Sequence, residues 1–549
     1  MLLTLMVSAV EDQNAPIIHL IEEARTLVMA HAGTSNSRDA VDKRVKNQTG
    51  KLLNSQDEVG GWSKLNSKPT SKGQDRDGMA DDWEKSNDLT PKDPRDKNHD
   101  SDGDGYTNLE EYLNSLVAHD NSVKKPELHK RIVTAGQDKI AKSQNPQKGR
   151  EVVIKKSKKG WILLRSGEPY YVRGVGGQIQ LQYLATNGGN SIRTWRTGPK
   201  TKELMDKADK LGLTVCLGLW MDHERHGFDY NNTDAVQRQF NAFKKYVEEF
   251  KDHPALLMWG VGNEVETNYT NPKVWDAMNA ICKMIKKVDG KHPTLTALAW
   301  PSNHVIKEIL QRVPDVDIIG LNSYAGLKDS LREGQKHGWK GPTIVTEYGP
   351  NGFWEMPKTS WGSYLEMNSS DKAKLYGERT DLIKNDQNCL GGYAFLWGEK
   401  QERTRTWFSL IFNGKNITAG VDELIKSWTN KYPRNQAPNV TKLVVNDKLA
   451  EKNVELMPRQ IYVAKVNVTD DNSEKLKYQW ELRHETVARS LGGDIEEIPP
   501  EVKGSIVKIG TNGTLKFKAP NQPGKYRLFV YVVDTQHKIG HANFPFIVR

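Results

Sequence analysis

Eight short apolar runs alternate with amphipathic helical stretches between residues 171 and 398, and this alternation constrains the fold more than any other feature of the sequence. Short apolar runs bounded by turn residues are typical of buried parallel strands, and the stretches between them have the spacing of covering helices. Eight such units predict a closed (β/α)8 barrel, an α/β fold, and not an open sheet. The runs are YVRGVGG (171–177), SIRTW (191–195), TVCLGLW (214–220), ALLMWGVGNE (255–264), TLTALAW (294–300), VDIIGLNSY (316–324), TIVTEYG (343–349) and GGYAFLWG (391–398).

The 549 residues are too many for one hydrophobic core, and changes in composition divide them. After the barrel, short alternating strands separated by turn residues predict an all-β immunoglobulin-like sandwich, which we interpret as an accessory module. A hairpin-like stretch just before the barrel would close its floor or edge. The expected parts are a helical or irregular segment (1–72), an Asp- and Gly-rich loop segment (73–118), a linker (119–149), the barrel (150–435) and the sandwich (436–549).

Two acidic residues stand at strand ends of the predicted barrel, where the reacting groups of such barrels project. Glu264 closes the fourth run and Glu347 lies near the end of the seventh. A single Glu after a strand is more often a helix N-terminal charge. Two carboxylates on opposed strands, however, suit glycoside cleavage with retention, in which one protonates the leaving oxygen while the other attacks the anomeric carbon.

The polar residues that close other runs would support this pair. Arg193 and Tyr324 would keep Glu347 ionised by charge pairing and hydrogen bonding. The acid must hold its proton near neutral pH, so we expect Glu264 to lie beside apolar surface and to have the higher pKa of the two.

The motifs WGVGNEVE and IVTEYGP resemble the acid/base and nucleophile motifs of clan A glycoside hydrolases. The barrel resembles the TIM-barrel domain of glycoside hydrolase family 2 and related β-glucanase-like proteins. This resemblance implies Glu264 as acid/base, Glu347 as nucleophile and Asn263 as partner of the sugar 2-hydroxyl. The substrate-binding residues that it and the strand ends indicate are Arg193, His223, His226, Asn263, Trp300, Asn322, Tyr324, Trp354 and Trp397.

Some of these assignments stay open. Substrate contact and structural hydrogen bonding are equally compatible with His223 and His226. Tryptophans that we expect either to stack on sugars or to fill the core are Trp195, Trp220, Trp300, Trp354, Trp361 and Trp407. No jelly-roll domain precedes the barrel in this sequence, so we expect an endo-acting or transglycosylating relative and not an exo-acting galactosidase or glucuronidase of the complete family 2 layout.

The stretch DSDGDGYTNLEE (100–111) fits the EF-hand calcium loop at every position, and a second copy precedes it with Gly73 in place of the first ligand. Such paired loops resemble the calcium repeats of dockerin and thrombospondin type 3 modules. Residues 15–118 also resemble the C-terminal tail of bacterial pectate lyase-like proteins, without the β-helix that would hold a lyase site. The expected ligands of a structural Ca²⁺ are Asp100, Asp102, Asp104, Tyr106 and Glu111 in one loop, and Asp75, Asp77 and Glu84 in the other.

Composition excludes some partners. The net charge is +10, but Lys and Arg are scattered and not clustered with aromatic residues, so nucleic acid is not expected. The sequence contains no apolar run of about 18 residues, so no membrane span is predicted. The three cysteines, Cys216, Cys282 and Cys389, lack metal-ligand spacing and are interpreted as small buried hydrophobic residues. The start MLLTLMVSAVEDQ lacks the basic region of a secretory signal, yet the calcium loops favour a secreted or periplasmic location.

The sequence therefore predicts a monomeric retaining glycoside hydrolase that cleaves a β-linked polysaccharide or oligosaccharide, with β-glucan as the first candidate and no catalytic cofactor. A transglycosylase that uses the same two glutamates is an alternative. A non-catalytic carbohydrate-binding or scaffold protein is a second alternative, which retention of both glutamates disfavours.

Overall fold

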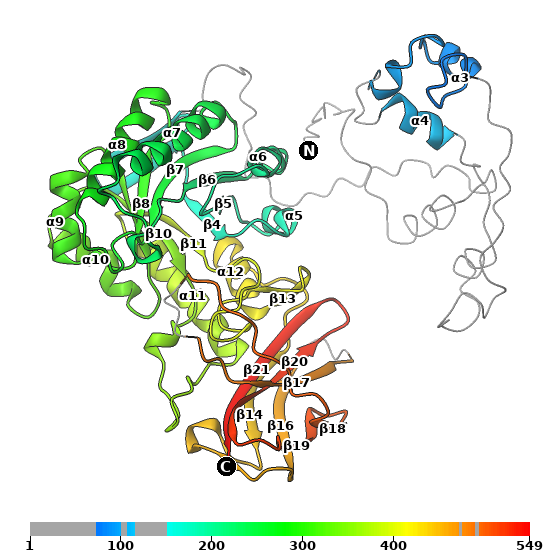
Figure 1. Cartoon of the computed structure of the whole chain (residues 1–549), viewed down its shortest axis with the longest axis vertical. Coiled ribbons are helices and arrows are strands. Elements are labelled where there is room, and N and C mark those ends of the chain that lie inside the picture. Colours follow the sequence, from blue (N-terminus) through cyan, green and yellow to red (C-terminus); the bar gives the residue numbers. More distant parts are fainter. Residues whose placement is uncertain (1–72, 100, 102–106, 116–150, 471–474, 489–492) are drawn as a thin grey trace, which may run out of the picture. The chain divides into compact units, whose positions relative to one another are not determined.

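A computed structural model describes residues 73–99, 101, 107–115, 151–470, 475–488 and 493–549 (Figure 1). The chain divides into two compact units, Met1–Ala141 and Lys142–Arg549. The described part of the first unit contains helix α3 (Asp81–Ser86), a 3-10 turn (Asp96–Asn98) and helix α4 (Asn108–Ser115). Its small core includes Met79 and Tyr112, and the ring of Tyr112 meets that of Trp83 edge-on.

The second unit contains a closed barrel of parallel strands in the order β10-β11-β4-β5-β6-β7-β8-β9. This confirms the predicted fold class, and each of the eight apolar runs overlaps one strand, the last of which begins before its run, at Cys389. Their interiors are apolar because both faces of each strand are covered. The strands are β4 (Val172–Gly176), β5 (Ser191–Arg193), β6 (Thr214–Leu219), β7 (Leu256–Asn263), β8 (Thr294–Leu298), β9 (Ile318–Asn322), β10 (Thr343–Tyr348) and β11 (Cys389–Ala394).

Helices surround the barrel in Figure 1 and bury their apolar faces on it. Several begin at a side-chain cap: Asn232 accepts the backbone N–H of Ala235 at the start of α7, and Ser302 accepts that of Val305 at the start of α9. Helix α8 buries Trp275, among other residues, in the same core. The helices are α5 (Leu181–Thr186), α6 (Thr201–Lys210), α7 (Thr233–Phe250), α8 (Lys273–Val288), α9 (Asn303–Arg312), α10 (Leu327–Lys336), α11 (Ser369–Asn385) and α12 (Ala419–Thr429).

A three-stranded sheet closes one end of the barrel. Its strands are β1 (Val152–Ser157), β2 (Gly160–Arg165) and β3 (Glu168–Pro169). Backbone hydrogen bonds join this sheet to Lys291 and Gln387, which precede strands β8 and β11. It therefore covers the amino-terminal ends of the strands, as the hairpin-like sequence predicted, and the carboxyl-terminal ends remain for a site.

The carboxyl-terminal module is a β-sandwich whose core includes Trp480, Phe517 and Phe546. One sheet has the order β14-β16-β19-β18, and the other has the order β12-β13-β21-β20-β17, with β15 beside β21. The strands are β12 (Ile411–Phe412), β13 (Asn416–Thr418), β14 (Asn439–Val445), β15 (Glu455–Leu456), β16 (Ile461–Thr469), β17 (Lys477–His484), β18 (Ile506–Ile509), β19 (Thr514–Lys518), β20 (Gly524–Val533) and β21 (Lys538–Val548).

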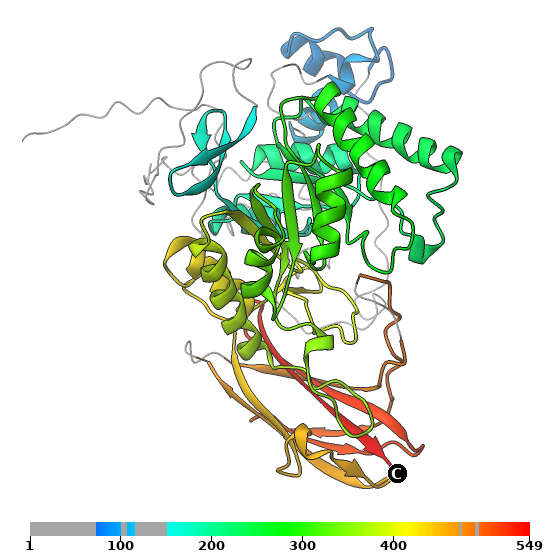
Figure 2. The same cartoon turned by 90° about the vertical axis from the view of Figure 1, so that its left-hand side faces the viewer.

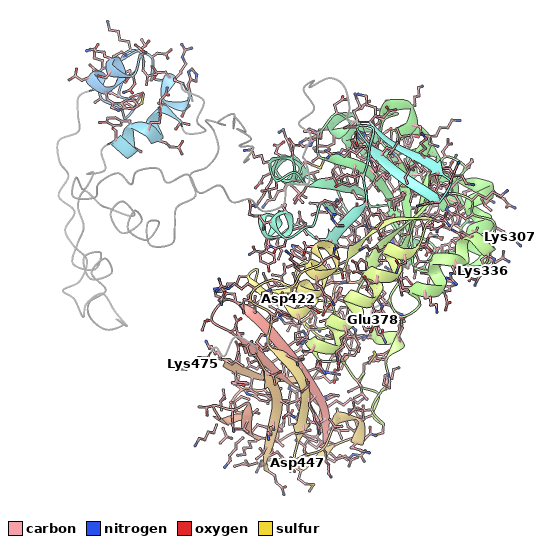
Figure 3. The ribbon with its side chains drawn as sticks, turned by 180° about the vertical axis from the view of Figure 1, so that it is seen from behind. Lys307, Lys336, Glu378, Asp422, Asp447 and Lys475 are labelled. Carbon is pink, nitrogen blue, oxygen red and sulfur yellow. The ribbon has the colours of Figure 1, made fainter. Side chains whose placement is uncertain are left out.

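The barrel and the sandwich share a sheet. Strand β13 precedes the last barrel helix in the chain, yet it pairs in parallel with β21, with Ile417 opposite Lys538. Beside this pairing, Lys538 forms a buried ion pair with Asp422 of α12, which is labelled in Figure 3 where the helix meets the sandwich. The sandwich is therefore built onto the barrel by main-chain hydrogen bonds as well as by side chains.

Cys216, Cys282 and Cys389 are buried and unbridged, which confirms their prediction as small core residues. Among the described residues, no helix has the length and apolar character that crossing a membrane requires.

Candidate active site

Glu264 follows the last residue of β7 in a left-handed backbone conformation. Its φ is +52°, two residues after Gly262 with a φ of +74°. Residues with a side chain rarely adopt this region, and strain of this kind is often found at functional sites. The Glu264 N–H donates to the carbonyl oxygen of Ala297 on β8, which fixes the turn. The carboxylate then lies at the mouth of the barrel, where the Nδ2 of Asn322 donates to its Oε1 at 2.7 Å.

Glu347 lies on β10 and is only 6% exposed. Its Oε1 accepts hydrogen bonds from the Nη1 of Arg193 at 2.9 Å and the Nε1 of Trp195 at 2.8 Å. Its Oε2 accepts one from the hydroxyl of Tyr324 at 3.1 Å. Hydrogen bonds to a carboxylate and a buried guanidinium both favour the charged form. The carboxyl group of Glu347 is therefore held in one orientation by three donors.

A hydrogen-bond network joins the two glutamates. The Nη2 of Arg193 donates to the Oδ1 of Asn263 at 2.6 Å. The Nδ2 of Asn322, which bonds Glu264, also donates to that Oδ1 at 3.1 Å. The Oγ1 of Thr346 donates to the Oδ1 of Asn322 at 2.7 Å and so fixes the amide orientation. Residues from four strands thus hold the two carboxylates relative to each other, as a preorganised site requires.

The two carboxylates have different electrostatic environments. Burial raises the pKa of Glu264 well above its ordinary value, and the negative charge of Glu347 raises it further. Glu264 therefore keeps its proton near neutral pH, while Glu347 receives the donors that favour its charge. One group can give a proton and the other can attack as an anion, which is the division of roles in acid-assisted nucleophilic substitution at a sugar.

A cleft of about 2280 Å³ opens at this end of the barrel, and Glu264 and Glu347 both line it. Trp300 and Trp354 are 40% and 50% exposed, which leaves apolar ring surface for stacking. The predicted site residues that the structure brings together in the lining are Asn263, Glu264, Asn322, Tyr324, Glu347, His226, Trp300 and Trp354.

Three predicted site residues lie behind the lining. Arg193 reaches the site through its bond to Glu347. His223 is buried and stacks between the rings of Trp220 and His226, and burial lowers its pKa to about 4, so it is uncharged at neutral pH. Trp397 is 2% exposed and its Nε1 donates to the carbonyl oxygen of Ile179 at 2.7 Å. The structure therefore places His223 and Trp397 outside the lining of the cleft.

The structure also adds residues that the sequence reasoning did not assign. Trp195 was named only as a possible stacking or core residue, yet it donates to the carboxylate of Glu347. Glu266, the second acid of WGVGNEVE, accepts the N–H of Ala299, and burial raises its pKa to about 7. Glu402 is 5% exposed, lines the cleft and pairs with the Nζ of Lys400 at 2.9 Å. No periodicity or motif marks Glu402, because it follows the last strand in a polar loop.

A second acidic cluster lies in the amino-terminal unit. Carboxylate oxygens of Asp75, Asp77 and Glu84 lie within 4.8 Å of one another. Glu84 is fully buried, and among the described residues neither of its oxygens has a hydrogen-bond partner. Burial and the neighbouring aspartates raise its pKa to about 7. A Cβ at Gly73 would lie 2.6 Å from the carbonyl oxygen of Met79, so the backbone occupies the place of the missing first ligand.

These three residues fit a hard cation, since unpartnered buried carboxylates that repel one another are what such an ion neutralises. In the second predicted loop, Asp100, Asp102, Asp104 and Tyr106 lie outside the described residues. Glu111, the last residue of that loop, lies in helix α4.

The chain is similar over part of its length to several known proteins. The beta-glucuronidase of Streptococcus agalactiae serotype V is 25% identical over 219 residues, which cover 33% of this chain and 35% of that protein. The beta-glucuronidase of Homo sapiens is 26% identical over 194 residues, covering 32% of this chain and 27% of that protein. The alignments thus span about a third or less of these relatives. A solved calcium binding mutant of Bacteroides uniformis beta-glucuronidase 2 aligns at 14% identity and a TM-score of 0.41, over 72% of this chain and 48% of that chain.

A family comparison covers the part of the barrel that carries both glutamates. Residues 178–369 match the domain described as glycosyl hydrolases family 2, TIM barrel domain. The matched range includes Glu264, Glu347 and the polar residues that connect them. Residues 178–369 of this closed barrel are therefore similar to the glycoside hydrolase family 2 TIM-barrel domain.

Proposed function

We propose that the chain is a retaining glycoside hydrolase in which Glu347 is the nucleophile and Glu264 the acid/base. The observation that carries this proposal is the contrast between the two carboxylates. Glu347 accepts hydrogen bonds from Arg193, Trp195 and Tyr324, whereas burial and the charge of Glu347 raise the pKa of Glu264. A general acid that keeps its proton beside an ionised nucleophile is what double displacement requires.

The reaction would run in two steps. In the first, Glu347 attacks the anomeric carbon while Glu264 gives its proton to the leaving glycosidic oxygen, so a covalent glycosyl ester forms and the leaving sugar departs neutral. In the second, Glu264 takes a proton from water, and the oxygen of that water displaces Glu347 from the sugar. Oε2 of Glu347 accepts only the Tyr324 hydroxyl among the described residues, whereas Oε1 accepts two donors, so we assign the attack to Oε2.

We propose a β-linked polysaccharide or oligosaccharide as the substrate. The volume of the cleft and the exposed rings of Trp300 and Trp354 support a substrate of several sugar units. β-Glucan is the first candidate, and the beta-glucuronidases among the relatives add β-glucuronides to the panel.

The test combines a glycan panel with two active-site variants. The wild type should release product of retained anomeric configuration, as observed by NMR. Glu347→Ala should lose turnover, and Glu264→Ala should lose mainly the cleavage of poor leaving groups, with azide restoring activity as a β-glycosyl azide. Wild-type rates in both variants, or an inverted product, would refute the assignment. Products longer than the donor would show transglycosylation, and glycan binding without new reducing ends would show a scaffold.

We also propose that the amino-terminal unit binds Ca²⁺ through Asp75, Asp77 and Glu84 as a structural ion. The support is the buried, unpartnered carboxylate of Glu84 facing two aspartates. A calcium-dependent fold suits the secreted or periplasmic location that we propose for the protein.

A further inference from the structure

The sandwich contributes part of the lining of the active-site cleft. After β17 the chain leaves the sandwich, and residues 493–500, here called the rim segment, line the cleft together with residues of the barrel mouth. In Figure 2 this dark orange part of the chain rises from the sandwich toward the barrel. Within it, Ile495 is 97% exposed although it lines the cleft. An apolar side chain held open over a cleft is available for contact with a ligand.

Polar contacts hold the rim segment to two places on the barrel mouth. The Oδ1 of Asp494 lies 3.1 Å from both the Nη1 of Arg225 and the Nε2 of His226. The Oε2 of Glu496 accepts the backbone N–H of Arg403 at 2.7 Å. The side chain of Arg403 also donates to the carbonyl oxygen of Ala488.

The positions of these contacts show where the rim segment crosses the barrel. Arg225 and His226 follow strand β6, whereas Arg403 follows strand β11. Strands β4 and β5 lie between β11 and β6 in the closed barrel. The rim segment is therefore bonded to two loops of the barrel mouth, one on each side of the pair β4 and β5.

The base of the rim segment is fixed as well. The Nη2 of Arg527 lies 2.9 Å from the carboxylate of Glu485 and donates to the carbonyl oxygen of Tyr364 at 2.8 Å. The Nδ2 of Asn543 donates to Glu366 at 2.6 Å. Together with the pairing of β13 and β21, these contacts join the barrel to the sandwich from which the rim segment extends.

The direction of the bound glycan follows from the two catalytic carboxylates. They act on the glycosidic bond from opposite sides, so the sugar chain must lie across the line that joins the end of β7 to the end of β10. This line divides the barrel mouth into two sides, one with strands β8 and β9 and the other with strands β11, β4, β5 and β6. The glycan therefore extends from the β8–β9 side, which carries the exposed Trp300, toward the side that the rim segment crosses.

We infer that the rim segment is an end wall of the cleft, so that the protein acts on the termini of glycan chains and Asp494 is a positioning residue of that wall. This inference rests on the proposed glycosidase function. It departs from the expectation of an endo-acting enzyme, which the sequence alone had favoured. A sandwich that completes a substrate site is also more than an accessory module.

The test uses oligosaccharides of the substrate glycan that carry a bulky cap at either the non-reducing or the reducing end. The wild type should cleave one capped form and reject the other by at least about tenfold in kcat/KM, because one end must fit against the wall. In the variant Asp494→Ala/Glu496→Ala both contacts to the barrel are lost, and the discrimination between the two forms should fall by about tenfold. Glu451→Gln, which changes an exposed acid of the same sandwich outside the lining, is the control and should keep the wild-type ratio.

The outcomes separate the two proposals. The end-wall inference is overturned if the wild type cleaves both capped forms at equal rates. It is also overturned if the double variant discriminates between them as strongly as the wild type does. If no glycan is cleaved, the glycosidase proposal fails, and binding of the same capped forms to the wild type, measured by calorimetry, decides about the wall. Equal affinity for both forms, or no binding of either, then overturns it.

Discussion

Replacing Tyr324 with phenylalanine removes the hydroxyl that bonds Glu347, the proposed nucleophile, and leaves the ring in place. That hydroxyl donates to the Oε2 of Glu347 at 3.1 Å, and the ring packs against Phe395 and Phe408. A hydrogen bond to a charged group contributes about 1.5–3 kcal/mol. If the hydroxyl aims the attacking oxygen and stabilises the carboxylate when it leaves again, kcat/KM should fall about 10- to 150-fold, at about 1.4 kcal/mol per factor of ten.

The assay is the hydrolysis of aryl β-glycosides, accompanied by thermal unfolding. Tyr348→Phe is a matched control. Tyr348 follows Glu347 directly on β10, but its hydroxyl contacts Thr380 and not Glu347. That variant should lose about 1 kcal/mol of stability and keep its catalytic constants. Activity of Tyr324→Phe within threefold of the wild type would refute the reasoning, as would an equal loss of activity in both variants.

Three further predictions concern charge. Glu264 must be protonated to act as the acid, so kcat/KM of the wild type should decrease as pH rises through the elevated pKa of Glu264. Glu347→Gln removes the charge that helps to raise this pKa, so NMR titration should show a lower pKa for Glu264 in that variant. In the presence of a metal chelator, the amino-terminal unit should lose stability as pH rises from about 4.5 to about 7, because Glu84 binds its proton more tightly in the folded than in the unfolded chain. Calorimetry of the full chain that shows stability rising over this pH range would contradict the prediction. At pH 8, Ca²⁺ at a hundredfold excess over its Kd should stabilise this unit by about 2.7 kcal/mol, and Glu84→Gln, which leaves Asp75 and Asp77 intact, should abolish most of the effect.

The barrel was predictable because its signal is local. Each strand is an apolar run of a few residues, and each polar residue that closes a run reports on the barrel mouth without any knowledge of distant contacts. Glu264 and Glu347 were found in this way. Arg193 and Trp397 both lie in apolar runs, so this signal could not tell which of them bonds Glu347. In the folded protein Arg193 donates to Glu347, whereas Trp397 donates to the carbonyl oxygen of Ile179.

The remaining features depend on contacts between residues far apart in the chain. Asp494 lies more than two hundred residues after His226, in a polar loop with no period that would mark its role. Strand β13 is three residues long and finds its partner β21 only in the folded molecule. Gly73 looked like a defect in a calcium loop, but its lack of a side chain leaves room for the Met79 carbonyl oxygen.

The parallel pairing of β13 with β21 has a consequence for attempts to divide the protein. Cutting the gene between the barrel and the sandwich, near residue 436, would strip β13 of its neighbour and expose unpaired N–H and C=O groups together with the buried Asp422. Exposed strand edges recruit other chains. A barrel produced without the sandwich should therefore self-associate or precipitate. A recombinant fragment that retains the barrel together with β21 should remain in solution.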